Sequence, residues 1–409
     1  MPTHDTGTAR RAEVLAAAAD QFAAAGYAGS SLRQVAERAG ILPGSLYHHF
    51  DSKEAIAVEL VQAMAAGLVG IRRRGLRRRG DPIADLRAFV TDCAAFFARH
   101  RAALALCLLE PPGTARAGLT DLVRAQPAGV GSAIGILIGR AADAGRLRTG
   151  IDPGLLRAAL RHVAVTGSVS APDRPPTELP AAFCTLVLDG LCAPAASGTV
   201  PQTDRLTRVL ADIRARWAAP ETPAGRRGEI LEAARIEFAR RGVDATTMRD
   251  IAETAGFPAA GIYRHFASKR QIVTEIVGGF STELLAGTDR IIDATTDPVV
   301  ALDGLCGLMG LAGPRFRREY ATVQVWWRTA SPDDADQAMS GNRRRLQVLT
   351  AILTSGLRNG SFSSDTGIDL LALGVRELLW VPFQVTTGGT RVQDSLHTIL
   401  HGGAAQPAR

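Results

Sequence analysis

The chain contains two lysines, Lys53 and Lys269, whereas all of its other Lys and Arg residues are arginine. Each is expected in the first turn of a helix, where the helix dipole makes a cation slightly unfavourable. A phosphate group at that place would interact with the ammonium group and with the helix N–H groups. A solvated surface lysine is the alternative, but the repetition of one position favours phosphate contact.

The two lysines end two copies of one segment. Residues 10–53 align with residues 226–269 without a gap, and 19 of the 44 aligned positions are identical. The copies close with the related motifs SLYHHFDSK and GIYRHFASK. A repeat with a period of 216 residues indicates a duplicated domain, because solenoid repeats run to roughly 20–50 residues.

The residues around each lysine fit the same chemistry. Tyr47 and Tyr263 can offer a hydroxyl to phosphate, or else pack in the core of a small helical unit. His49 and His265 are expected to contact phosphate or to cap the backbone locally. A metal role is not expected for either histidine, because no set of Cys, His and carboxylate partners is repeated around both, so no metal site and no cofactor is expected.

Where the copies differ, base recognition is the better explanation, since phosphate contacts carry no sequence information. Position 48 is histidine and its counterpart Arg264 is arginine, which can bond guanine O6 and N7 together. The turns before these residues differ as well. The predicted DNA contacts in full are Ser31, Arg33, Pro43, Gly44, Ser45, Tyr47, His48, His49 and Lys53, with Thr247, Arg249, Ala259, Ala260, Gly261, Tyr263, Arg264, His265 and Lys269.

The spacing of apolar residues predicts the elements that position these side chains. Each copy opens with a helix that has one apolar stripe. A second helix follows, with Ser31 or Thr247 as N-cap and Gln34 or Asp250 three residues later. Short third helices are expected over 44–50 and 260–266, and a fourth helix begins at each lysine. Helix, turn and short helix form the helix-turn-helix arrangement, whose second helix enters the DNA major groove.

At these residues the sequence resembles the TetR/AcrR family of bacterial transcriptional regulators. The resemblance implies an all-α fold and two complete family units in one chain. Each unit would comprise a three-helix DNA-binding domain and a helical domain for ligand binding and dimerisation. It implies a double-stranded DNA operator, and repression that a small apolar ligand relieves. With two heads in one polypeptide, a single chain is expected to act as a pseudo-dimer on an asymmetric operator, and further oligomerisation stays open. A constitutive or architectural DNA-binding protein is the alternative.

The repeat and the composition together divide the chain. The expected DNA-binding domains are residues 8–56 and 225–272, and the expected regulatory domains are residues 57–192 and 273–402. Residues 193–224 are expected to form a linker that contains a helix over 204–217. Its flanking Pro-containing segments favour a semi-rigid spacer.

Aromatic residues of the regulatory domains are candidates to line a ligand pocket, although each of them could equally be a core residue. They are Phe89, Phe96, Phe97, Tyr320, Trp326, Trp327 and Trp380. The arginine run 72–79 has no counterpart in the second half. It is interpreted as the solvated end of the fourth helix, with extra phosphate contacts or an acidic partner as the alternative.

Composition limits the other function classes. Residues 1–219 hold 26 Lys and Arg against 19 Asp and Glu, and residues 220–409 hold 21 of each, so the whole net charge of +7 lies in the first half. A basic excess fits a polyanionic partner. The five cysteines lack a Cys-x-x-Cys pair and favour a reduced, cytoplasmic protein. No apolar run reaches the ~20 residues of a membrane helix, and no enzyme motif is present, so neither a membrane partner nor catalysis is expected.

Overall fold

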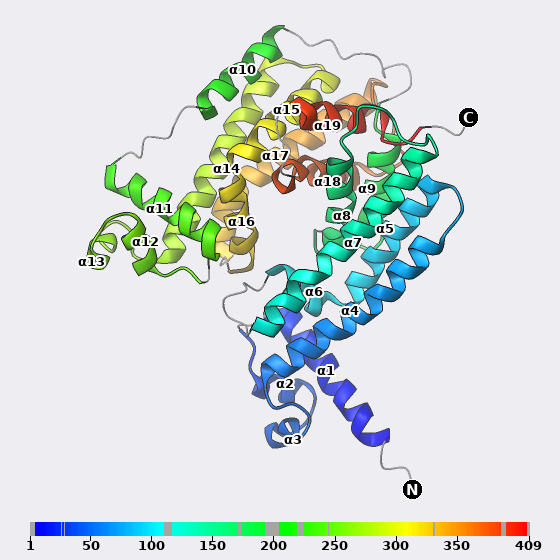
Figure 1. The fold of residues 1–409 in the computed structure, drawn as a ribbon. Coiled ribbons are helices and arrows are strands. Elements are labelled where there is room, and N and C mark those ends of the chain that lie inside the picture. The colour runs from blue at the N-terminus through cyan, green and yellow to red at the C-terminus, as the bar shows by residue number, and fades with distance from the viewer. Residues whose placement is uncertain are drawn as a thin grey trace.

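The computed structural model describes residues 5–25, 27, 29–109, 117–170, 173–192, 204–218, 225–243, 245–329, 332–385 and 390–406. Within these ranges the chain is helical, with two isolated β-bridges and no β-strand. Figure 1 shows two small helical heads attached to a larger helical body. The all-α fold predicted from the sequence is confirmed.

The first head consists of α1 (Asp5–Ala25), α2 (Leu32–Arg38) and α3 (Pro43–Tyr47). Its buried side chains include Phe22, Val35, Leu46 and Phe50. Helix α3 is shorter than the predicted 44–50. The backbone continues as a tight turn, in which the His49 N–H donates to the Leu46 carbonyl only three residues back.

The second head consists of α11 (Gly225–Arg241), α12 (Met248–Thr254) and α13 (Ala259–Ile262). Its core is a separate cluster that includes Ile230, Phe238, Ile251, Ile262 and Phe266. The predicted third helix over 260–266 is again too long, because the chain turns after Ile262 as it does after Tyr47. Gly242 ends α11 with a φ of 83°, the left-handed conformation that glycine adopts without steric cost.

The first body carries the first head on a continuous helix, which crosses the expected domain boundary at residue 56. Its helices are α4 (Lys53–Arg77), α5 (Pro82–Arg99), α6 (Arg101–Leu109), α7 (Ala117–Asp143), α8 (Pro153–Ser170) and α9 (Glu178–Asp189). Asp81 caps α5 through its side chain, which accepts from the Ala84 N–H. Helices α4 and α5 approach closely at glycines, since a Cβ on Gly75 would lie 2.3 Å from the Phe89 ring.

The second body repeats this plan. Its helices are α14 (Lys269–Ala294), α15 (Pro298–Arg315), α16 (Arg317–Thr329), α17 (Pro332–Arg358), α18 (Ile368–Leu379), the 3-10 turn η2 (Val381–Gln384) and α19 (Thr390–Gly402). Asp297 caps α15 as Asp81 caps α5. The two bodies share one continuous hydrophobic core.

The linker helix α10 (Asp204–Ala218) forms where a helix is predicted, and it docks on the second body. The Trp217 indole N–H donates to Glu283 of α14 at 3.1 Å, and the Trp217 carbonyl accepts from Arg315 of α15. The Trp217 ring also packs edge-on against Phe316 at 5.0 Å between centroids. The described part of the linker is therefore a fixed part of the second body.

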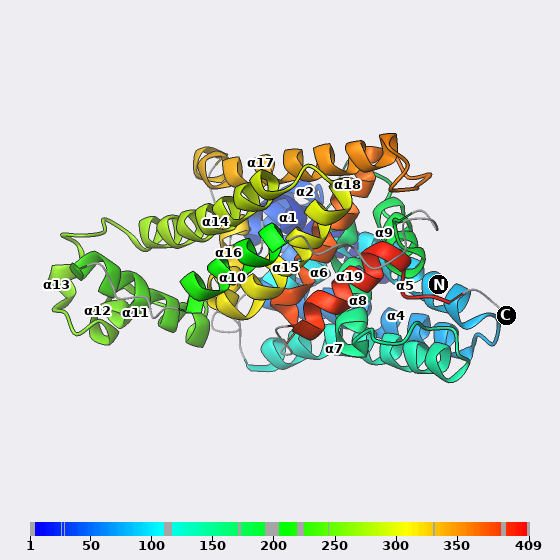
Figure 2. The same cartoon turned by 90° about the horizontal axis from the view of Figure 1, so that it is seen from above.

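The two bodies meet at a reciprocal seam, seen from above in Figure 2, where α8 and α9 pack against α18, η2 and α19. The Leu191 N–H donates to the Leu400 carbonyl at 2.7 Å, and the Ala404 N–H donates to the Val187 carbonyl at 2.8 Å. Adding 213 to Leu191 of the first bond gives Ala404 of the second, and adding 213 to Val187 of the second gives Leu400 of the first. This is the pairing that a two-fold interface produces, made here within one chain.

Helix α4 is the one single helix in the described ranges that is long and apolar enough, by composition, to cross a membrane. Its apolar residues Ile56, Val61, Met64 and Leu68 are buried against the first body. Lys53, the first residue of α4, also bonds to the turn of the first head. We therefore interpret α4 as a core helix.

Candidate nucleic-acid interface

Each head exposes an aromatic side chain at the end of its third helix. Tyr47 is 56% exposed and Tyr263 is 57% exposed, so the alternative that these tyrosines pack in the core is wrong. Leu42, at the start of α3, is 76% exposed. Large side chains that stay in solvent next to a basic surface are suited to contact a partner such as DNA.

Most of the predicted DNA contacts are exposed side chains. Those exposed are Ser31, Arg33, Pro43, Gly44, Ser45, Tyr47, His48, Thr247, Arg249, Ala260, Tyr263 and Arg264. His49, Lys53, His265 and Lys269 are half-buried. Gly261 is buried next to Pro258 and the Arg264 guanidinium, so the structure does not support a direct contact there. The side chain of Ala259 lies outside the described residues.

Lys53 and Lys269 hold their heads together. Lys53 Nζ donates to the carbonyls of Tyr27 (2.7 Å) and Ser30 (2.8 Å), and it lies 4.3 Å from the centre of the Tyr27 ring. Lys269 Nζ donates in the same way to the carbonyls of Val243 (2.6 Å) and Thr246 (2.8 Å). Each lysine ties the start of the fourth helix to the turn between the first two. The solvated-surface alternative is therefore wrong, while phosphate contact stays a prediction.

Replacing Lys53 with methionine is expected to destabilise the first head by about 2–3 kcal/mol. The substitution removes two charge-assisted hydrogen bonds and leaves two carbonyls without these donors. Thermal unfolding of the full chain measures the loss, and Lys269→Met should lower the stability of the second head similarly. Arg33→Met is the matched control, because the Arg33 side chain is 80% exposed and its pairing with Glu37 contributes little.

Unchanged melting of Lys53→Met would contradict the tether. The salt dependence of DNA binding tests the phosphate contact separately, since each lost phosphate contact lowers the slope by about one. A slope equal to that of the wild type in Lys53→Met would restrict this lysine to its structural role.

A second pair of basic residues, which the sequence analysis did not identify, stabilises the turn that follows each third helix. Arg11 forms an ion pair with Glu59 of α4, donates to the His49 carbonyl and stacks 4.0 Å from the Phe50 ring. Arg227 repeats these contacts with Glu275, His265 and Phe266. Arginine is present at this position in both copies, which could have indicated a shared role. Its charge alone did not distinguish a structural ion pair from a DNA contact.

The second helix of each head begins as predicted. Ser31 and Thr247 each form a capping box with the residue three positions later, Gln34 and Asp250. The hydrogen bonds from Thr247, together with Arg241, lower the pKa of Asp250. Arg33 and Arg249, in the first turn of these helices, are each 80% exposed. They are therefore available to a phosphate backbone.

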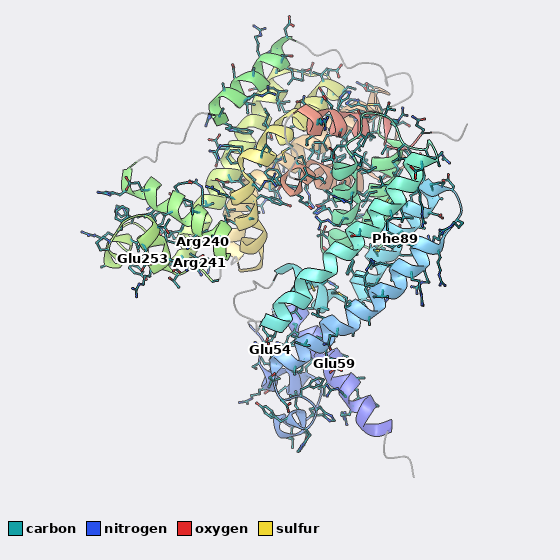
Figure 3. All side chains as sticks on the ribbon, viewed as in Figure 1. Glu54, Glu59, Phe89, Arg240, Arg241 and Glu253 are labelled. Carbon is teal, nitrogen blue, oxygen red and sulfur yellow. The ribbon has the colours of Figure 1, made fainter. Side chains whose placement is uncertain are left out.

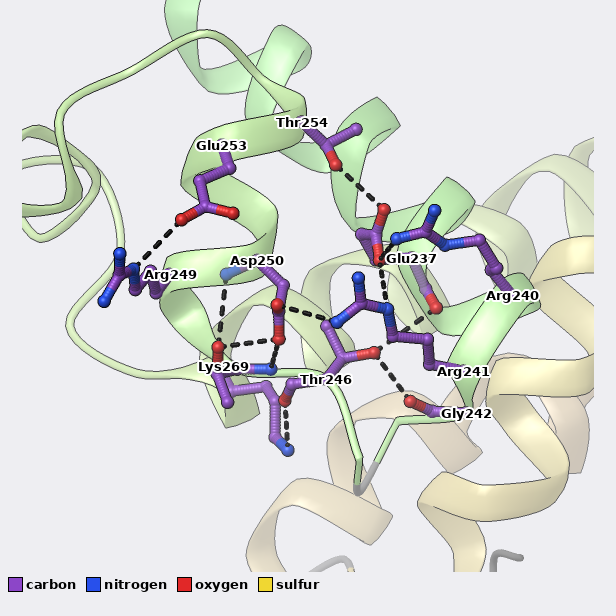
Figure 4. Close-up of polar contacts among 11 residues, drawn as sticks. Glu237, Arg240, Arg241, Gly242, Thr246, Arg249, Asp250, Glu253, Thr254 and Lys269 are labelled. Carbon is purple, nitrogen blue, oxygen red and sulfur yellow. Dashed lines mark hydrogen bonds and ion pairs between the residues drawn. The ribbon is translucent and has the colours of Figure 1, made fainter. Parts of the chain in front are cut away.

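The second head contains a charged network that the first head lacks. Glu237, which is buried, pairs with Arg240 (3.0 Å) and Arg241 (3.2 Å) and accepts from Thr254 (Figure 4). Arg241 also reaches Asp250 at 2.8 Å. The first head has Gln21, Ala24, Ala25 and Arg38 at the positions equivalent to Glu237, Arg240, Arg241 and Thr254. The heads therefore differ in their internal electrostatics as well as at the positions that are predicted to read bases.

The joints between head and body differ too. In the second half Arg235 of α11 pairs with the buried Glu319 of α16 at 3.1 Å, and Arg318 pairs with Glu232. The four equivalent positions of the first half, between α1 and α6, are all alanine: Ala16, Ala19, Ala102 and Ala103. The second head is thus coupled to its body by charge, and the first by close apolar packing.

The arginine run at the end of α4 lies far from the first head. Lys53 and Arg74 are separated by roughly 30 Å along the helix at 1.5 Å per residue. Arg78 pairs with Asp92 at 2.8 Å, and Arg79 donates to the Leu76 carbonyl, so part of the run closes the first body. Arg73, Arg74 and Arg77 are exposed, as the solvated-end interpretation expects.

The candidate pocket residues of the first body are core residues. Phe89 and Phe97 are 0% and 2% exposed, and Phe96 is 5% exposed. Phe89 and Phe96 fill the space left by Gly75 and Gly67 of α4, so they are needed for helix packing. Figure 3 labels Phe89 among the packed helices of the first body. In this structure the three side chains pack in the core, as the core alternative expects, and their role in a ligand pocket stays a prediction.

In the second body the aromatic candidates form a stacked group. Tyr320 lies 5.6 Å from Trp380 and 4.9 Å from Phe383, measured between ring centroids. Tyr320 and Trp380 are half-buried. The side chains of Trp326 and Trp327 lie outside the described residues. This group is the remaining candidate for a ligand site.

One arginine beside this group has unusual partners. The Arg345 guanidinium lies 5.2 Å from the centre of the Trp380 ring, and its Nη2 is 3.3 Å from Met309 Sδ. No carboxylate pairs with it within the described part of the chain. Burial lowers the pKa of Arg345 to about 10. A cation held by a ring face and a thioether is suited to receive an anionic group.

Comparison with known proteins agrees with the duplicated heads. Residues 14–60 and 230–276 both match the family described as bacterial regulatory proteins, tetR family. The first match runs from within α1 to the first turns of α4, and the second from within α11 to the first turns of α14. Both include the exposed tyrosine and the tethered lysine of their head. The predicted resemblance is confirmed in both copies.

Longer similarities extend into the bodies. The chain is 34% identical over 166 residues to the HTH-type transcriptional repressor KstR2 of Mycolicibacterium smegmatis, covering 40% of this chain and 80% of that protein. It is 30% identical over 190 residues to KstR2 of Rhodococcus jostii, covering 45% and 93%. The solved structure of the ketosteroid transcriptional regulator KstR2 of Mycobacterium tuberculosis matches with 32% identity and a TM-score of 0.37, covering 42% and 89%. Each relative corresponds to fewer than half of the residues of this chain.

Proposed function

The chain belongs to the TetR family of bacterial transcriptional regulators, and we propose that it is a cytoplasmic repressor whose two heads bind one asymmetric operator. The observation that carries this proposal is the duplication of a complete head with different side chains at the base-reading positions. A symmetric dimer reads a palindrome because its two recognition helices are identical. Here the equivalent positions hold His48 in the first head and Arg264 in the second, so the two half-sites should differ.

The seam supports a single chain as the binding unit. Its reciprocal hydrogen bonds give the two bodies the arrangement of a two-fold dimer, and the first head lies at the bottom of Figure 1 with the second at its left. Because both heads belong to one polypeptide, binding of the second head is intramolecular. The effective concentration of such a head can reach the millimolar range when the geometry permits.

A ligand at the aromatic group of the second body would relieve repression. Tyr320 and Glu319 are neighbours on α16, so a ligand against Tyr320 acts on the helix that carries the ion pair to Arg235 of the second head. The ligand is a small apolar molecule, and Arg345 favours one with an anionic end. Release from the operator on addition of such a ligand supports this step, whereas unchanged binding would favour a constitutive DNA-binding protein.

Selection from random DNA is expected to return an operator with two unlike half-sites. Arg264 should favour guanine at one position of the second half-site, with a discrimination of roughly 1–3 kcal/mol for a bidentate contact. The wild-type chain is compared with Arg264→His, which copies the first head at this position. The variant should lose the guanine preference and keep the preferences of the first half-site.

Arg270→His is the matched control, because it replaces an exposed arginine next to Lys269, at the start of α14. It should leave the selected bases unchanged. A perfect inverted repeat selected by the wild-type chain would overturn the asymmetric operator.

A further inference from the structure

Four side chains with metal-binding chemistry lie together at the seam. Asp303 of α15 and His397 and His401 of α19 each place one ligand atom within 4.8 Å of the other two. His397 Nδ1 is 2.6 Å from Asp303 Oδ1, and Cys192 Sγ, which comes from the first body, is 2.8 Å from His401 Nδ1. We propose that Asp303, His397 and His401 bind a divalent transition-metal ion, with Zn²⁺ as the best match, and that Cys192 orients His401 from the other body.

His401 is the residue that points to a ligand. It is 6% exposed, and its Nε2 atom is buried without a hydrogen-bond partner in the described part of the chain. A buried polar atom without a partner costs about 1–3 kcal/mol, so native proteins rarely leave one. Because Nδ1 faces Cys192, Nε2 is the nitrogen left for a metal ion. A bound ion would satisfy it.

The geometry suits a zinc site. Histidines four residues apart lie on one face of a helix, which is the spacing used by helical zinc ligands. Zinc takes imidazole nitrogen and carboxylate oxygen at about 2.0–2.2 Å. Ligand atoms within 4.8 Å of one another therefore need only small side-chain rotations to reach a shared ion. His397, at 30% side-chain exposure, is the route by which the ion enters.

The hydrogen bond to Cys192 sets which nitrogen can bind an ion. Metal binding requires a neutral imidazole with one free nitrogen. When Nδ1 carries the proton and donates it toward Cys192 Sγ, Nε2 presents its lone pair. Outer partners of this kind fix the orientation of metal-bound histidines.

A simple ion pair between helices does not account for the cluster. The first body ties α5 to α9 with one such pair, Arg87 to Asp189 at 2.5 Å. The residues of the first body equivalent to Asp303, His397 and His401 are Arg87, Cys184 and Leu188, none of which is an acid or a histidine. The second body has therefore acquired a second histidine that an ion pair does not use, next to a thiol from the opposite body.

The site would strengthen the seam. His401 accepts the Cys192 N–H through its carbonyl, so its backbone already pairs with the first body. An ion on its side chain fixes α19 to α15 and orders the same contact. Metal binding is thus expected to stabilise the association of the two bodies, and this expectation does not depend on DNA binding.

Zinc binding to the metal-free full-length protein, measured by competition with a chromophoric chelator, tests the site without DNA. One Zn²⁺ per chain is expected, together with a higher melting temperature. Asp303→Asn and His397→Gln should each weaken binding by at least about 100-fold, and Cys192→Ser by about 10-fold, which is typical for an outer partner. His100→Gln, a histidine in the first body that stacks on Phe96, is the control and should bind like the wild type.

Absence of saturable binding in the wild type would overturn the proposal. So would wild-type affinity in His397→Gln, which is the mildest substitution because His397 is partly exposed. Circular dichroism establishes that each variant is folded. If Asp303→Asn does not fold, His397→Gln decides the question alone.

Discussion

Combining Tyr263→Ala with Arg264→Ala is expected to lower operator affinity by roughly 10²–10⁴-fold, although all predicted DNA contacts of the first head stay intact. The seam joins the two bodies that carry the heads, so the second head binds at a high effective concentration once the first is bound. Loss of one head removes this gain together with its own contacts. Fluorescence anisotropy at one fixed salt concentration measures the change.

The length of the DNA provides the internal comparison. On a fragment that contains only the first half-site, the double variant and the wild type should bind equally. Arg290→Ala is the matched control, because it removes one positive charge on α14 that pairs with Asp212 of the linker helix. Equal affinity of the double variant and the wild type for the full operator would show that the second head is not a DNA reader.

Replacing His162 with alanine is expected to destabilise the contact between the bodies by about 3–5 kcal/mol, the cost of leaving a buried charge without its partner. His162 of α8 lies 2.6 Å from Glu377 of α18, and both side chains are about nine-tenths buried. Gln384 of η2 adds a hydrogen bond to His162 at 2.9 Å. The effect should lie at the low end of the range, because Arg376 also contacts Glu377.

A double-mutant cycle separates the pair from the packing around it. Urea unfolding is compared for the wild type, His162→Leu, Glu377→Leu and the variant with both changes. Each single variant should be strongly destabilised, and the double variant should recover most of the loss, because well-packed apolar residues can replace a buried ion pair at little cost. Additive losses would show that the two residues are not coupled.

Acid unfolding should report the same pair. Burial alone raises the pKa of Glu377, but the hydrogen bond and charge of His162, with Arg376, outweigh it and lower the pKa to about 2. A carboxyl whose pKa is lower in the folded state stabilises the protein above its unfolded pKa near 4.5. This stability is lost as the pH falls from about 4.5 to about 2. His162→Leu should shift that loss to higher pH.

The sequence alone determined the duplicated heads, the helical class and the linker helix. These features depend on interactions between residues close in the chain: the capping boxes at Ser31 and Thr247, the apolar stripe of each first helix and the Asp caps of α5 and α15. Local patterns of this kind leave the same mark on the sequence wherever the segment lies in the fold. The positions that are predicted to read bases are exposed for the same reason, because the local helix-turn-helix sets the direction of their side chains.

The tertiary structure decided what depends on residues far apart in the chain. Lys53 carries the same charge whether it faces a phosphate or the carbonyls of Tyr27 and Ser30, so only the packing of α4 on the turn showed the tether. Phe89 is equally apolar in a pocket or opposite Gly75. No metal site was expected, yet Cys192 and His401, 209 positions apart, meet at the seam. Side-chain chemistry can be read from the sequence, but its partners are set by how the two bodies pair.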